Sequence, residues 1–285
     1  MTILITGASG AIGLQVVQQL VDRGAAVRAL VRDPAKTTFP PGVEVVKGDL
    51  LDIASLHQAM AGASTLFLLN GVVPDEFTQA LLTLNVARDA GIDRIVYLSV
   101  IHSDKYVNVP HFAGKFGVER MLEQMGFGAT ILRPAYFMQN DASVKNVGVY
   151  TMPIGNKGLA MIDTRDIAEI AAIELLRREQ ASESLPLSRL NLVGPDALTG
   201  VAVAAIWSEV LGRPISYGGD DTASFEKTMR NFMPGWMAYD MRLMCERFLT
   251  DGMNPDAGDV ERLTTLLGRP LRSYRAFASE ISAAA

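Results

Sequence analysis

The sequence predicts a doubly wound α/β fold, in which helices cover both faces of a parallel sheet. Strand and helix patterns alternate through the first half of the chain, and runs such as Thr65–Leu69 and Ile95–Val100 are almost entirely apolar. Strands of that kind are buried on both faces. A glycine-rich turn follows the first strand. Ligands of this fold class bind at such turns, so the turn supports the same prediction.

The expected elements follow one another in a regular order up to Pro134. The strands are expected near 2–6, 26–32, 43–47, 64–69, 94–99 and 129–132, and the helices near 12–23, 52–61, 75–91 and 110–126. Beyond Pro134 we expect short strands near 148–152 and 158–162, a helix at 166–178, a strand at 189–193 that returns to the main sheet, and helical stretches at 199–211, 222–250 and 256–267. The last residues, 282–285, are expected to fray.

The end of the regular strand–helix alternation at Pro134 predicts two structural parts in the chain. Residues 1–134 form a dinucleotide-binding domain of the Rossmann type, whose sheet is completed by 160–195. Residues 135–159 and 196–285 form a smaller, mostly helical lobe that binds the substrate.

Composition excludes several classes of protein. The chain has 285 residues, 49% of them hydrophobic, which is enough for one large domain or two intimate ones. Its net charge of -5, with no long basic run, argues against nucleic-acid binding. The single cysteine fits a reducing compartment, and no apolar run reaches the roughly 18 residues of a membrane span. We therefore expect a cytoplasmic monomer or homodimer. Three histidines and one cysteine give no metal-ligand spacing, so no metal is expected.

The turn after the first strand has glycines at G-x-x-G-x-x-G spacing, at Gly7, Gly10 and Gly13. Such a turn aims backbone N–H groups and a helix N-terminus at a phosphate. The alternative is an ordinary strand–turn–helix with incidental glycines, but the preceding strand and the amphipathic helix that follows favour a dinucleotide site. The residues expected to bind the cofactor here are Thr6, Gly7, Ser9, Gly10, Ala11, Ile12 and Gly13.

The end of the second strand favours NADP(H) over NAD(H). Arg32 stands where a guanidinium can clamp a 2'-phosphate, and Lys36 can add a second charge, although Asp33 could instead accept from a ribose hydroxyl. Asp49, followed by Leu50, can accept from the adenine amino group or cap the next helix, a role for which Asp52 is better placed. Asn70 and Gly71 follow the fourth strand, at the ligand-binding edge of the sheet.

Four segments of the chain resemble one family. They are Thr6–Gly13; Val31–Asp33 with Lys47–Leu50; His111–Leu122 continuing through Thr130–Pro134 to Phe137–Asn140; and Ile162–Ala168. Across roughly the first two thirds of its length the chain is similar to atypical short-chain dehydrogenases/reductases of the NmrA-like group. The resemblance implies NADP(H) binding. It also implies kinship with NADPH-dependent quinone and triphenylmethane-dye reductases, and with redox-sensing regulators that have no known turnover.

Most short-chain dehydrogenases use a Tyr-x-x-x-Lys pair, and the resemblance places Lys115 at the lysine and His111 at the tyrosine. Lys115 is therefore expected to bind the nicotinamide ribose, with Ser99 nearby in the usual serine region. His111 is either a substitute acid or a surface histidine in a first helical turn. Tyr136 is a further catalytic candidate. The remaining expected cofactor contacts lie later in the sequence, at Ser99, Pro134, Tyr136 and Phe137.

A stretch rich in methionine and aromatic residues, 225–253, either packs as core or roofs an aromatic pocket, and both can hold on opposite faces. The expected substrate contacts are Phe137, Met138, Phe232, Met233 and Trp236.

The predicted function is an NADPH-dependent oxidoreductase that transfers hydride to a quinone or other conjugated aromatic compound. The alternatives are a non-catalytic NADP(H)-sensing regulatory protein and a tailoring enzyme of aromatic polyketide biosynthesis.

Overall fold

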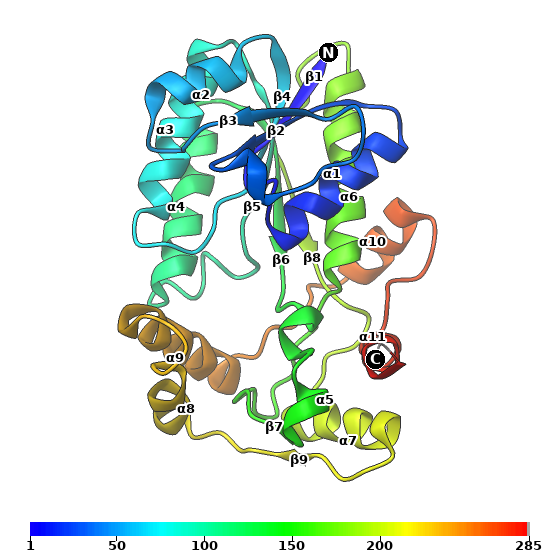
Figure 1. Ribbon diagram of the computed structural model, residues 1–285. Helices are drawn as coiled ribbons and strands as arrows, with labels where there is room; N and C mark the ends of the chain where they lie inside the picture. Colours follow the sequence, from blue (N-terminus) through cyan, green and yellow to red (C-terminus); the bar gives the residue numbers. More distant parts are fainter. Residues whose placement is uncertain (284–285) are drawn as a thin grey trace. The chain divides into compact units, whose positions relative to one another are not determined.

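The computed structural model describes residues 1–283 and is built around a seven-stranded sheet (Figure 1). Its strand order is β3-β2-β1-β4-β5-β6-β8, and the pairs from β3–β2 to β5–β6 are parallel. The strands are β1 (Thr2–Ile5), β2 (Ala26–Val31), β3 (Glu44–Lys47), β4 (Ala63–Leu68), β5 (Arg94–Leu98), β6 (Gly128–Pro134) and β8 (Ser188–Leu192). The predicted doubly wound fold is confirmed, including the late strand that returns to the sheet.

Helices cover both faces of this sheet. In Figure 1, α2, α3 and α4 lie on one side of it, and α1 and α6 lie on the other. Their bounds are α1 (Ala11–Asp22), α2 (Ile53–Met60), α3 (Glu76–Asp89), α4 (Pro110–Gln124) and α6 (Thr164–Gln180). The inner strands are buried on both faces, with Leu4, Leu66 and Ile95 fully shielded from solvent. Burial on both faces explains why these strands are continuous apolar runs in the sequence.

The chain divides into two compact units. The sheet unit comprises residues 1–100, 114–133 and 167–190. The second unit comprises residues 101–113, residues 134–166 and the chain from Asn191 onward. The predicted assignment of cofactor binding to 1–134 and of substrate binding to a separate lobe stays a prediction.

The second unit is mostly helical. It contains η2 (Met138–Asp141), α5 (Val144–Val147), β7 (Val149–Tyr150), α7 (Gly200–Leu211), β9 (Ser216–Tyr217), α8 (Thr222–Met229), α9 (Gly235–Thr250), α10 (Asp259–Leu267) and α11 (Tyr274–Ala283). Strands β7 and β9 pair in parallel as a small separate sheet. Within residues 1–283, no helix is both long and apolar enough to cross a membrane.

Four local expectations for this part differ from the structure. Residues 158–162 form isolated bridges rather than a strand, and 222–250 is two helices separated before Gly235, with Pro234 as the N-cap of α9. Helix α10 begins only at Asp259 because Gly258, with φ +86°, is left-handed. The sequence did not predict α11, which runs through Ala283 where fraying was expected; residues 284–285 lie outside the described residues.

Candidate functional site

The glycine turn has the geometry of an anion cradle. Gly7 has φ +60°, and a Cβ on it would lie 2.8 Å from the Leu69 carbonyl oxygen. A Cβ on Gly13 would lie 2.2 Å from the Gly7 oxygen, so only glycine allows α1 to start this close to the turn. Gly10 is the N-cap of α1, and no side chain caps the helix. The first N–H groups of α1 therefore point out of the turn, where they can bind an anion.

Thr6 has a structural role beneath this turn. Its hydroxyl donates to the carbonyl oxygens of Phe67 and Leu69, at 3.2 and 3.0 Å, and accepts from the Leu69 N–H at 2.8 Å. These bonds fix the end of β4 against β1. Thr6 thus shapes the cradle from below, and its predicted contact with the cofactor stays a prediction.

A cavity of about 190 Å³ opens beside the turn, at the carboxyl ends of β1, β2 and β4. It brings together six of the predicted cofactor residues: Gly7, Ser9, Arg32, Asp49, Leu50 and Gly71. Asn70 stands next to Gly71 and is only 5% exposed. Neither its amide nitrogen nor its amide oxygen has a hydrogen-bond partner among residues 1–283. A buried amide without partners is costly, so this one indicates a site for a polar ligand.

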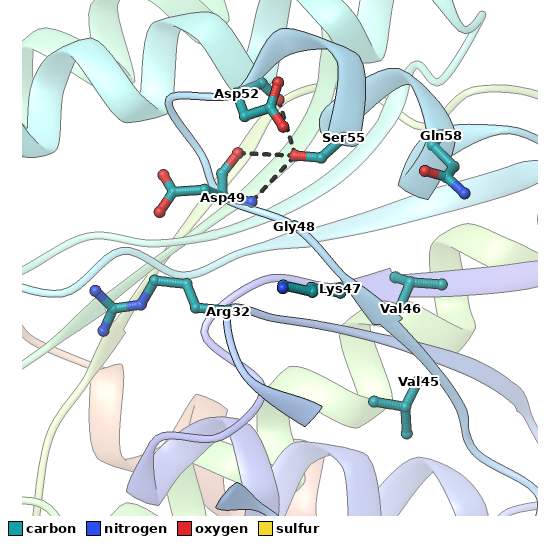
Figure 2. Close-up of a pocket in the computed structure, with 9 residues that line it drawn as sticks. All are labelled: Arg32, Val45, Val46, Lys47, Gly48, Asp49, Asp52, Ser55 and Gln58. Atoms are coloured by element: carbon teal, nitrogen blue, oxygen red, sulfur yellow. Dashed lines mark hydrogen bonds between the residues drawn. The ribbon is translucent and has the colours of Figure 1, made fainter. Parts of the chain in front are cut away.

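A second, larger pocket of about 680 Å³ adjoins the first and shares Arg32, Gly48 and Asp49 with it (Figure 2). In the described part of the chain, the Arg32 guanidinium makes no hydrogen bond or ion pair. Lys47, at the end of β3, lines the same pocket. Lys47 is not among the cofactor residues predicted from the sequence, although it lies in a segment that carries the family resemblance.

Asp33 and Lys36, the charged residues that follow Arg32, interact within their own loop. Asp33 accepts from the Ala35 N–H at 3.1 Å and lies 3.6 Å from Lys36, which is 81% exposed. The Asp33 carboxylate is thereby turned into its own loop, the short helix η1 (Pro34–Lys36), which leaves Arg32 as the dominant charge at the end of β2.

The acidic residues after β3 hold the backbone. Asp49 accepts from the Leu51 N–H at 2.9 Å, and Asp52 caps α2 through the Ala54 N–H, as predicted. Ser55 ties the two together by bonding the backbone of Asp49 and Asp52 (Figure 2).

Lys115 forms a buried ion pair that the sequence did not predict. Its Nζ lies 2.6 Å from Glu76 Oε1, at the start of α3, and both side chains are almost fully buried. The same Nζ lies 6.0 Å from the centre of the Tyr97 ring. A lysine has three N–H donors. One is bonded to Glu76, which anchors the ammonium group while the other donors can reach a ligand.

Ser99 belongs to another buried network. Its hydroxyl donates to Glu119 at 2.5 Å, and Arg133 donates to the same carboxylate through Nε at 3.0 Å. Glu119 and Arg133 both come from the segment that carries the family resemblance. In this protein they lock α4 to β5 and β6. The predicted contact of Ser99 with the cofactor stays a prediction.

His111 faces a carboxylate contributed by a distant helix. Its Nδ1 hydrogen-bonds to Asp240 Oδ1, and its backbone N–H donates to Asp240 Oδ2 at 3.1 Å. Asp240, on α9, is 1% exposed, and the His111 side chain is largely buried. His111 is therefore a fixed, paired imidazole and not a free surface histidine.

Tyr136 is engaged in a buried cluster within the second unit. Its hydroxyl donates to Asp141 Oδ1 at 3.0 Å, and the Tyr274 hydroxyl donates to Oδ2 at 2.7 Å. Trp207 in turn donates to the Tyr274 oxygen at 2.9 Å. Burial raises the pKa of Asp141 to about 7, against the opposing effect of the tyrosine hydroxyl groups. Burial and the adjacent Asp141 also raise the pKa of Tyr136, which makes it a weaker acid.

The predicted substrate residues differ in exposure. Met138 is buried and Phe137 is partly buried beside the bridge to Ile162. Phe232 is 77% exposed and Trp236 is 40% exposed, while Met233 between them is partly buried. Helix α9 has two faces, with Met244, Cys245 and Phe248 in the core and Trp236 and Tyr239 outside it. The core interpretation of the methionine-rich stretch is right for one face, and the other face is open.

The fold and the cradle define a dinucleotide-binding α/β protein. The sequence model of the NmrA-like family matches residues 1–266, and the chain belongs to this family. It is 29% identical to an NAD(P)H azoreductase of Xenophilus azovorans over 99% of this chain and 98% of that protein. It is 30% identical to a (4-alkanoyl-5-oxo-2,5-dihydrofuran-3-yl)methyl phosphate reductase of Streptomyces griseus over 98% and 97% of the two chains.

The fold also matches that of a solved reductase. A crystal structure of an NADPH-dependent quinone oxidoreductase from Escherichia coli superposes with a TM-score of 0.84 at 25% identity. The match covers 98% of this chain and 99% of that chain. The family resemblance predicted from the sequence is thereby confirmed along nearly the whole chain.

Proposed function

We propose that this chain, an NAD(P)H-dependent oxidoreductase, transfers hydride from NADPH to a quinone or another conjugated aromatic acceptor. The observation that carries the proposal is a set of binding groups at one sheet edge that have no partner among residues 1–283. They are the N-terminus of α1, the Arg32 guanidinium and the Asn70 amide. The relatives from Xenophilus azovorans and Streptomyces griseus are both named as reductases, which supports redox chemistry of this kind.

These groups fit NADPH part by part. The turn from Gly7 to Gly13 suits the pyrophosphate, because it offers backbone N–H groups and a helix N-terminus. Arg32 suits the 2'-phosphate, with Lys47, which lines the same pocket, and Lys36 as additional charges. The buried amide of Asn70 suits a polar group further along the dinucleotide. When bound, NADPH would supply the hydride, and the residues of the chain would orient it.

Lys115 is suited to the nicotinamide ribose. Its ammonium group is held by Glu76, and the donors left over can bond vicinal hydroxyl groups. The ion pair also offsets part of the cost of burying the two side chains. Lys115 therefore orients the hydride donor without acting as a proton donor itself.

Proton donation is assigned to His111. Tyr136 is the weaker candidate because its hydroxyl already donates to Asp141 and its pKa is raised. His111 lies one helical turn before Lys115 on α4, and an imidazole is the side chain that most often serves as a general acid. For electron-poor acceptors, the reduced product stabilises its own charge, so proximity and orientation supply most of the rate.

The acceptor is proposed to contact the aromatic and sulfur-containing residues of the second unit. Phe137, Met138 and Met233 are at least partly shielded, whereas Phe232 and Trp236 have exposed flat surfaces that suit a planar compound.

The test is NADPH oxidation with a panel of quinones, azo dyes and triarylmethane dyes. We expect steady turnover with at least one acceptor, and slower turnover with NADH. Gly13→Ala is the control, because its Cβ would lie 2.2 Å from the Gly7 oxygen and should abolish both cofactor binding and turnover. Tight NADPH binding without turnover on any acceptor would overturn the proposal and favour a cofactor-sensing regulatory protein.

A further inference from the structure

The contact between His111 and Asp240 carries an inference beyond the assignment of His111 itself. Both carboxylate oxygens of Asp240 bond to the same residue, one to the imidazole Nδ1 and the other to the backbone N–H. In the described part of the chain these are the hydrogen bonds that Asp240 makes, and its side chain is 1% exposed. A buried carboxylate is costly unless it is paired, and here His111 is the group that pairs with it.

This geometry has two consequences for the imidazole. With Nδ1–H directed at Asp240, the tautomer is fixed and Nε2 is left to exchange a proton with another molecule. The carboxylate also fixes the orientation of the ring, as the buried aspartate does for the histidine of serine proteases. A helix cap alone would need only the backbone bond, so the bond to Nδ1 is the observation that a capping role leaves unexplained.

We propose that Asp240 is a positioning residue that holds His111 ready to deliver a proton from Nε2 to acceptors whose reduction creates an anion. The inference rests on the proposed function. A quinone or an azo compound takes one hydride and one proton to give a hydroquinone or a hydrazo compound. The hydride comes from NADPH, the proton comes from the imidazolium, and solvent then returns a proton to the ring.

Acceptors differ in whether they need that proton. A cationic triarylmethane dye becomes a neutral leuco compound when it accepts hydride, with no proton consumed. Removal of the Asp240 carboxylate should therefore slow azo and quinone reduction and spare reduction of the cationic dye. A purely structural role of Asp240 would affect all three acceptors alike.

The experiment compares Asp240→Asn with the wild type on methyl red, menadione and malachite green at saturating NADPH. We expect kcat for methyl red to fall about 100-fold, the lower end of what general acid catalysis contributes. The fall for menadione should be smaller, because its reduced anion is less basic. The rate for malachite green should change by less than about threefold. Glu246→Gln, an acid-to-amide change at a partly exposed residue of the same helix, is the matched control and should leave all three rates unchanged.

Two further measurements test the proposal, and the second needs no substitution, so it remains available if Asp240→Asn folds poorly. In a His111→Gln background, the Asp240 substitution should cause no further loss on methyl red, because both residues act in one step. In the wild-type protein, ¹⁵N-edited NMR should show a slowly exchanging Nδ1–H proton on His111.

The outcomes separate the inference from the proposed function. Equal losses on all three acceptors, unchanged methyl red reduction, or a His111 ring protonated only on Nε2 would overturn the role of Asp240 and leave the reductase proposal standing. Absence of wild-type turnover on every acceptor would overturn both.

Discussion

Two polar regions of this protein contrast in how their side chains are satisfied. At the cofactor edge of the sheet unit, Asn70 is buried without partners and Arg32 has no ion pair among the described residues. In the second unit, Asp141 accepts from Tyr136 and Tyr274 and is fully sequestered. We call the first region the open edge and the second the tyrosine cluster.

The difference shows which polar groups are available for a ligand. Buried polar groups normally have hydrogen-bond partners within the protein. A region where they have none is therefore a candidate binding site, in which a ligand supplies the missing partners. In the tyrosine cluster the partners are internal, and the cost of burying a carboxyl group appears instead as a raised pKa. We therefore assign binding to the open edge and stability to the tyrosine cluster, and the predictions below test that division.

The largest expected effect concerns the tyrosine cluster. Burial raises the pKa of Asp141 from 3.8 to about 7, so between these pH values the folded state holds a proton that the unfolded state has lost. The contribution of Asp141 to stability is therefore fully present below pH 4 and is lost as the pH rises to 7, by on the order of 4 kcal/mol. Asp141→Asn, neutral at every pH, should remove this fall. Urea unfolding of both proteins from pH 4 to pH 8 measures the difference.

The exposed carboxyl of Asp196 provides the control for that series. Asp196→Asn should track the wild type at each pH, since this side chain lies at the surface. Parallel curves for the wild type and Asp141→Asn would show that the cluster does not hold a buried proton, and would remove the contrast with the open edge.

The next largest effect concerns Arg32. Loss of a charge-assisted bond to a phosphate costs about 1.5–3 kcal/mol. Arg32→Gln should therefore raise the Kd for NADPH by roughly 10- to 150-fold. The Kd for NADH should barely change, because NADH has no 2'-phosphate. Isothermal titration with both cofactors checks the ratio, and equal losses for the two would place Arg32 outside the phosphate site.

The open edge and the sheet could be predicted from local sequence patterns. The cradle was predictable because its parts lie within a few residues of one another: Gly7, Gly10 and Gly13 impose the turn, and Arg32 follows the next strand. The repeated strand and helix patterns likewise predicted the sheet, since burial on both faces leaves a local apolar signal.

The partners of the catalytic candidates were not predictable in this way. Asp240 lies 129 residues from His111 in the sequence, and Glu76 lies 39 residues from Lys115. Each contact depends on how helices pack, and no local pattern records it. Asp141 and Tyr274 meet for the same reason, and Tyr274 opens a C-terminal helix that the sequence analysis missed.

A smaller effect is expected at Asn70, where a substitution should raise the stability of the free protein and weaken cofactor binding. An unsatisfied buried amide costs about 1–3 kcal/mol, so Asn70→Leu should stabilise the protein without cofactor, or at least leave its stability unchanged. The same change should weaken NADPH binding about tenfold. Thermal unfolding with and without NADPH measures both quantities in one experiment. Lower stability of the free variant would show that the amide has an internal role, as in the tyrosine cluster.

The smallest effect is expected at Lys36. Its side chain is 81% exposed and its Nζ lies 3.6 Å from Asp33 Oδ2, and exposed ion pairs are worth between 0 and about 1 kcal/mol. Lys36→Ala should therefore raise the NADPH Kd less than about fivefold. Lys47→Ala should cost more, because Lys47 lines the same pocket as Arg32. A larger loss for Lys36 than for Lys47 would mean that η1 rearranges when the cofactor binds. The added positive charge at the open edge would then come from the loop after β2 and not from β3.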